Sequence, residues 1–211
     1  MKSLKTNTLA QLFIICTRYL IGSAYAFACV VKIEGKRFTT MIPQGEDWNT
    51  PAHLFEVMYQ SNLYWNFLGW SQFFAAMLLM TQRYARLGAL IFLPISANIF
   101  MITVSYGFTG TPYITGLMLL ANVILIVWDW GYFKVLFNIS STNIERKRIW
   151  INDRTWEILG LILFIFTISF RWVLNSFDIL TWGATCLLIG LTGLFIGIKR
   201  KSIYQSTLQT I

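Results

Sequence analysis

Long apolar runs constrain this chain more than any other feature of its sequence. They occupy six segments: residues 10–31, 62–80, 87–107, 114–132, 156–174 and 179–198. About 20 apolar residues are enough for an α-helix to cross the hydrocarbon core of a bilayer. A helix also satisfies its own backbone polar groups, which lipid cannot do. We therefore expect an all-α polytopic membrane protein with six transmembrane spans.

Composition supports the membrane and argues against other partners. Apolar residues make up 56% of the 211 residues and charged residues 12%, whereas soluble domains carry about 25% charged residues. The net charge of +8 could suggest nucleic-acid binding, but the basic residues separate apolar segments and form no patch. Cys16, Cys29 and Cys186 lie far apart without a C-x-x-C motif, and His53 is the single histidine. We predict no disulfide framework and no metal site.

The distribution of Lys and Arg predicts the orientation of the chain. With six spans, twelve of the 17 Lys and Arg residues fall on the side of the termini, four on the opposite side, and Arg18 within the first span. The positive-inside rule then places both termini in the cytoplasm. A cleaved signal peptide is an alternative, because Ala24-Tyr25-Ala26 has the small-x-small form of a cleavage site. Arg18 and the continuation of the run to Val31 favour a retained span.

The connections predict three parts. The loop 32–61 contains NTPAHLFEVMYQ, where Thr50 is a suitable N-cap and Pro51 a suitable first helical residue. We expect a short amphipathic helix there, on the outer surface of the membrane. Residues 134–154 are polar and basic. They are expected to form a cytoplasmic linker between a four-helix bundle, 1–133, and a C-terminal two-span hairpin and tail, 155–211.

Arg18 is the most informative residue within an apolar run, because a charge at a helix centre costs about 2.5–3.5 kcal/mol on insertion scales. Asp129, near the end of the antiparallel fourth span, is the predicted partner at a similar depth. A polar interior of the bundle is expected to comprise Arg18, Gln72, Asn98, Asn122 and Asp129. Two interpretations stay open: these residues only hold helices together, or they handle a ligand or protons.

A second group of polar residues follows the first span on the predicted outer side. Lys32, Lys36 and Arg37 could attract an anionic head group or substrate, or could be solvated, with Lys32 reaching toward the interface. His53 and Glu56 lie one helical turn apart on the predicted outer helix. They could act as an acid–base pair or could simply be solvated.

Three stretches resemble the DoxX-like family of small bacterial membrane proteins. They are RYLIGSAYAFACVVKIEGKRF, FLGWSQFFAAMLLMTQRYARLGALI and ITGLMLLANVILIVWDW, within residues 10–133. The matching positions are Arg18, Gly22, Lys32, Gly69, Arg83 or Arg86, and Gly88. The resemblance implies a four-span bundle in the bacterial inner membrane. It also implies association with quinone-linked sulfur oxidation or membrane oxidoreductase complexes, usually as an accessory subunit. The hairpin 155–198 is additional to this pattern, and the C-x-x-C of redox-active relatives is absent.

The resemblance and the polar interior together favour an accessory subunit that binds a small amphipathic ligand, a quinone or a lipid. Its expected partners are membrane proteins or further copies of the chain. One alternative is a quinone-linked oxidoreductase component, for which the sequence contains no haem, metal or flavin motif. Another is a transporter of small molecules or lipids, although the two halves contain no convincing repeat. Whether the chain is an enzyme stays open.

Overall fold

The computed structural model describes residues 5, 7–39, 43, 48–139, 153–174 and 178–209, with side chains as far as residue 200. Within these residues every regular element is helical, as the sequence predicts. The elements are α2 (Thr8–Ile33), α3 (Pro51–Gln60), α4 (Leu63–Met80), α5 (Ala85–Ser105), α6 (Thr111–Trp128), α7 (Trp130–Phe133), the 3₁₀ helix η1 (Lys134–Phe137), α8 (Arg154–Leu174) and α9 (Ile179–Gln209).

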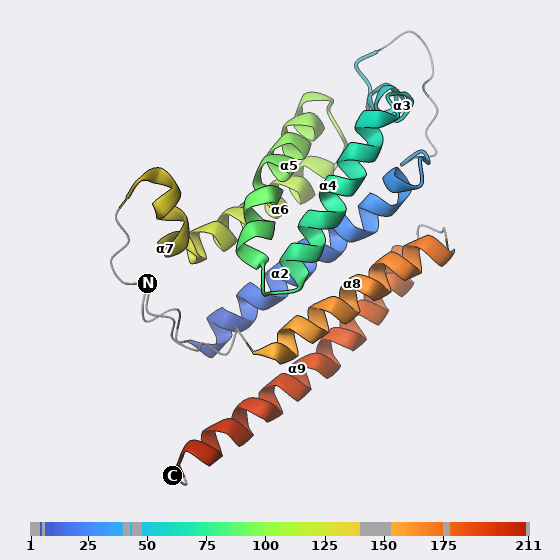
Figure 1. The fold of residues 1–211 in the computed structure, drawn as a ribbon. Helices are drawn as coiled ribbons and strands as arrows, with labels where there is room; N and C mark the ends of the chain where they lie inside the picture. The colour runs from blue at the N-terminus through green and yellow to red at the C-terminus, as the bar shows by residue number, and fades with distance from the viewer. Residues whose placement is uncertain are drawn as a thin grey trace.

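Helix α2 is the centre of the molecule. It packs most extensively on α4 and also contacts α6 and α8, while α5 packs between α4 and α6. Helices α2, α4, α5 and α6 therefore close into the predicted four-helix bundle (Figure 1). The core of this bundle is apolar and includes Ile14, Ile15, Ala76, Leu79 and Phe92, all buried.

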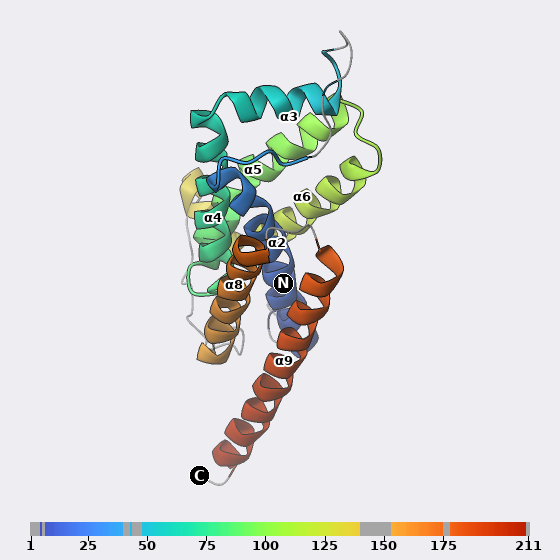
Figure 2. The same ribbon diagram turned by 90° about the vertical axis from the view of Figure 1, so that its right-hand side faces the viewer.

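The C-terminal hairpin is attached to the bundle through α8. This helix packs on α2 and α4, and α9 packs mainly on α8 (Figure 2). Gly160 of α8 permits the approach, because a Cβ there would overlap the Met80 carbonyl at the end of α4. Leu159 and Trp156 of α8 lie against Gly193 and Gly197 of α9. Small residues thus allow close packing at both faces of α8, as is common between membrane helices.

Helix α3 forms where the sequence predicts it and lies across one end of the bundle (Figure 2). Thr50 is its N-cap, and its side-chain oxygen accepts a hydrogen bond from the His53 N–H. Pro51 occupies the first turn, where its missing N–H costs nothing. No residue of α3 is buried. The Phe55 ring contacts Phe38, after α2, and Phe108, in the turn between α5 and α6.

Among the described residues, five helices are long and apolar enough to cross a membrane: α2, α5, α6, α8 and the segment Ile179–Arg200 of α9. The chain is therefore a multi-pass membrane protein by length and composition. The second predicted span forms helix α4 but is not among these five, so the span count differs from the predicted six. Polar residues such as Asn66 and Gln72 interrupt its apolar run. Most of the predicted linker 134–154 lies outside the described residues.

Candidate functional site

The predicted contact between Arg18 and Asp129 is present. Arg18 Nη2 lies 3.0 Å from Asp129 Oδ2, and the two residues are only 6% and 7% exposed. Asp129 is the residue immediately after α6, where the chain turns into α7. Each buried charge therefore has an opposite charge within hydrogen-bond distance, which buried ions require.

Two further side chains, Gln82 and Arg86, contact the Arg18–Asp129 pair. Arg18 Nη1 donates a 2.9 Å hydrogen bond to Oε1 of Gln82, which has φ +57° in the turn between α4 and α5. Arg86 Nε lies 3.5 Å from Asp129 Oδ1, and its guanidinium carbon is 3.3 Å from the Tyr132 ring centroid. Arg18 is thus level with a polar turn of the chain. We define Arg18, Gln82, Arg86 and Asp129 as the Arg18 cluster.

A tyrosine beside the Arg18 cluster reaches the C-terminal hairpin. The Tyr19 hydroxyl donates a 2.6 Å hydrogen bond to the carbonyl of Trp156 in the first turn of α8. Tyr19 is buried and follows Arg18 directly in α2. The same part of α2 therefore contacts α8, the turn between α4 and α5, and the end of α6. This arrangement positions helices and contains no obvious reacting group.

Asn122 forms a separate polar contact in the middle of the bundle. It is fully buried, and its amide faces α5 beside Pro94. In the amide orientation that satisfies both its atoms, the Asn122 oxygen accepts hydrogen bonds from the Leu93 N–H at 3.0 Å and from Ser96 Oγ at 3.3 Å. Its nitrogen donates to the Ala89 carbonyl at 3.2 Å. Asn122 thus bonds directly to backbone groups of α5, which is a structural role.

The prediction that Asn98 faces the interior is wrong. Asn98 lies on the exposed side of α5, whereas Ser96, two residues earlier, is buried. Two residues correspond to about 200° of helical rotation at 3.6 residues per turn, so both residues cannot face the interior. The inward face of α5 is instead set by Gly88, Ala89, Phe92 and Ser96.

Gln72 and Lys32 are buried at the other end of the bundle. Gln72 is 1% exposed, and its Oε1 accepts no hydrogen bond from any described residue. Lys32 was expected outside the bundle but is 5% exposed. Its ammonium donates to the Ala28 carbonyl at 2.8 Å and lies 4.5 Å and 5.4 Å from the Phe38 and Trp65 ring centroids. The side chain folds back along α2 to Ala28, and Gly69 of α4, which has no side chain, leaves room for the Lys32 Cβ.

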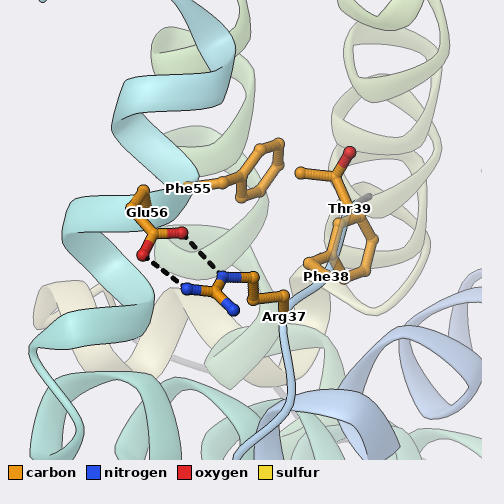
Figure 3. Close-up of a pocket in the computed structure, with 5 residues that line it drawn as sticks. All are labelled: Arg37, Phe38, Thr39, Phe55 and Glu56. Atoms are coloured by element: carbon orange, nitrogen blue, oxygen red, sulfur yellow. Dashed lines mark hydrogen bonds and ion pairs between the residues drawn. The ribbon is translucent and has the colours of Figure 1, made fainter. Parts of the chain in front are cut away.

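The other predicted outer cations are paired within the protein. Lys36 lies 3.0 Å from Glu34, and Arg37 binds both carboxylate oxygens of Glu56 at 2.8 and 2.9 Å (Figure 3). The Arg37 guanidinium, by hydrogen bonding, lowers the pKa of Glu56 to about 2. His53 Nδ1 instead lies 2.9 Å from Thr50 Oγ1. The hydrogen bonds of His53 and Glu56 thus go to other residues, and no bond joins the two among the described side chains.

A shallow hollow lies beside this ion pair. Its lining comprises Arg37, Phe38, Thr39, Phe55 and Glu56, and it is too shallow to enclose a water molecule (Figure 3). The hollow is therefore formed by the segment after α2 on one side and by α3 on the other. It is adjacent to Lys32, because the Phe38 ring contacts the Lys32 ammonium.

The buried residues among the predicted site residues thus lie in three places: the Arg18 cluster, Asn122 of α6 against α5, and Gln72 with Lys32. Sequence reasoning missed Gln82 and Trp65. Gln82 lies in a turn outside the apolar runs, and Trp65 was indistinguishable from other interfacial aromatic residues. Within the described part of the chain, no three His, Cys, Asp or Glu residues cluster as a metal site would require.

Comparison with known proteins gives no relative. No protein-family model, no curated protein and no solved structure matches the chain.

Proposed function

We propose that the chain is a DoxX-like accessory subunit of the bacterial inner membrane that binds a small amphipathic molecule, a quinone or a lipid. Both termini would face the cytoplasm, and the outer end would be the one covered by α3. The observation that carries the proposal is the burial of Lys32 and Gln72. Lys32 has no carboxylate partner among the described residues, and Gln72 has an oxygen without a donor there.

Buried polar groups that lack partners are costly, so they point to a ligand that would satisfy them. The Arg18 cluster makes a weaker demand, because Asp129 pairs with both Arg18 and Arg86, although Nε2 of Gln82 is also buried without a partner among the described residues. The ligand of this proposal therefore belongs at the α3 end of the bundle. The Arg18 cluster would serve as the structural support that positions α2.

An accessory role agrees with the chemistry present. Glu56 is paired with Arg37, and His53 is hydrogen-bonded to Thr50. In this arrangement the two residues of the predicted outer acid–base pair therefore do not bond to each other, and no proton can pass directly between them. In the Arg18 cluster, Arg18 and Arg86 are both paired with Asp129. A ligand-binding subunit requires no reacting group of its own.

Mass spectrometry of co-purified small molecules tests the proposal. The full chain would be purified from its native membrane in mild detergent, and its lipid and quinone content compared with that of the whole membrane. We expect one species to be enriched severalfold with the wild-type protein. Gln72→Leu should enrich this species less than Asn98→Leu does, which is the matched control because Asn98 lies on the exposed face of α5. Composition equal to that of the host membrane would contradict the proposal.

A further inference from the structure

The buried Lys32 lies at the end of a membrane span, where lipid head groups would be found. It is the next-to-last residue of α2, and the Phe38 and Trp65 rings flank its ammonium. The Ala28 carbonyl takes one of its three N–H donors. A carbonyl and two rings stabilise a cation, but they leave its charge without a counter-ion.

Charge balance at this end of the molecule favours an anion from outside the protein. The neighbouring acidic side chains already have partners, since Glu34 pairs with Lys36 and Glu56 with Arg37. No carboxylate contacts Lys32 in the part of the chain that the structure describes. A desolvated cation without such a partner is costly, and a phosphate oxygen would supply both the negative charge and the acceptors.

The hollow beside Arg37 marks the side from which this anion would approach. Phe38 contributes to the lining of the hollow, and its ring centroid also lies 4.5 Å from the Lys32 ammonium. Arg37 uses Nε and Nη2 for Glu56, and no described residue bonds to its Nη1. A phosphate at the surface of the hollow could therefore meet Arg37, and could reach Lys32 once rotation of the Phe38 side chain opens space.

The register of α2 and α4 places Gln72 one turn deeper than Lys32. Gly69 contacts Lys32 and Ile33, whereas Ala76 and Met80 contact Gly22, so Gln72 lies opposite the turn of α2 that contains Cys29. The Gln72 atom without a partner among the described residues is Oε1, an acceptor, so it calls for a donor, which the phosphate and ester oxygens of a lipid cannot supply.

We infer that Lys32 and Arg37 form a binding site for the phosphate of an anionic phospholipid, entered past Phe38. The inference rests on the proposed function, because it names the amphipathic molecule that the α3 end would hold. An uncharged quinone offers no anion to Lys32 or Arg37, and a zwitterionic lipid adds a cation for which the paired carboxylates Glu34 and Glu56 leave no free partner among the described residues.

The experiment measures lipid binding to the delipidated full chain by native mass spectrometry. Phosphatidylglycerol, phosphatidylcholine and inorganic phosphate would be titrated separately against the wild type, Lys32→Gln and Lys36→Gln. We expect phosphatidylglycerol to bind at least tenfold more weakly to Lys32→Gln than to the wild type. Lys36→Gln is the matched control, because it removes the same charge four residues away and should bind within about twofold of the wild type.

The comparison of ligands identifies the source of the phosphate. Lys32-dependent binding of phosphatidylglycerol alone supports a lipid site, whereas equal Lys32-dependent binding of inorganic phosphate overturns the lipid and shows a free-anion site. Equal affinity of phosphatidylglycerol for all three proteins also overturns the inference. Phe38→Ala provides a second test if Lys32→Gln does not fold: opening the route should raise the affinity severalfold, and unchanged or weaker binding would contradict the proposed entry.

The two proposals can fail separately. An uncharged species enriched from the native membrane and retained by Lys32→Gln would overturn the anionic site but support a ligand-binding subunit. No enriched species, together with Lys32-independent phosphatidylglycerol binding, would overturn both.

Discussion

The two ends of the bundle bury cations in different ways. Arg18 is paired with Asp129, bonded to Gln82, and joined through Asp129 to Arg86. Lys32 is buried to the same degree but contacts a carbonyl and two aromatic rings. The protein thus neutralises one cation internally and leaves the other without a carboxylate among the described residues. Equal burial therefore does not imply an equal role: the first arrangement favours structure, and the second favours a ligand.

The largest expected effect comes from breaking the pair at the Arg18 end. Arg18→Ala and Asp129→Ala should each lower the free energy of unfolding by about 3–5 kcal/mol, because each leaves a buried charge unpaired. The double mutant should recover part of this loss. Folded yield and thermal unfolding in detergent measure the cycle. If the double mutant loses as much as the two single mutants combined, the pair is not coupled.

Packing beside the Arg18 cluster should give the next largest effect. A Cβ at Gly160 would overlap the Met80 carbonyl and approach the Tyr19 ring to 2.9 Å. Gly160→Val should therefore destabilise the protein by about 1–3 kcal/mol, the usual cost of overpacking. Gly190→Val is the control, since no described atom lies within 4 Å of its Cβ position. Equal unfolding temperatures for the two variants would contradict the close contact of α8 and α4.

The smallest expected effect is a pH response at the Lys32 end. The Arg37 guanidinium lowers the pKa of Glu56 from 4.5 to about 2. A carboxyl with a depressed pKa stabilises the folded state above its unfolded pKa, and this stabilisation is lost as the pH falls through the folded value. The wild type should therefore lose a small increment of stability between about pH 4.5 and 2.

Thermal unfolding across this pH range checks the prediction. Glu56→Gln should lack the Glu56 contribution, so its unfolding temperature should change less than that of the wild type between pH 4.5 and 2. Parallel curves for the two proteins would show that the Arg37–Glu56 pair contributes nothing at this end.

Some of these features could be predicted from the sequence because local chemistry determines them. Thr50 and Pro51 mark the start of α3, and the apolar runs mark the long helices. Asp129 could be paired with Arg18 from helix depth alone. Each of these predictions uses distance along one helix, which is fixed by the 1.5 Å rise per residue.

The features that were not predicted depend on rotation and on turns. Asn98 was placed inside because both faces of a membrane helix are apolar, so hydrophobic periodicity gives little information about which face is buried. Gln82 reaches Arg18 only because the turn between α4 and α5 adopts a positive φ at that residue. Lys32 folds inward against Gly69 of another helix, a contact that sequence spacing cannot reveal.

Replacing each cation by an uncharged apolar residue tests the contrast between the two ends most directly. Thermal unfolding of the delipidated protein would be measured for Arg18→Met and Lys32→Met. Arg18→Met should unfold at a clearly lower temperature, because it leaves Asp129 with only the more distant Arg86. Lys32→Met should unfold at the wild-type temperature or above it, since the described residues hold no carboxylate that it would leave unpaired. An equal fall in both variants would show that the protein itself satisfies Lys32 and would contradict the account.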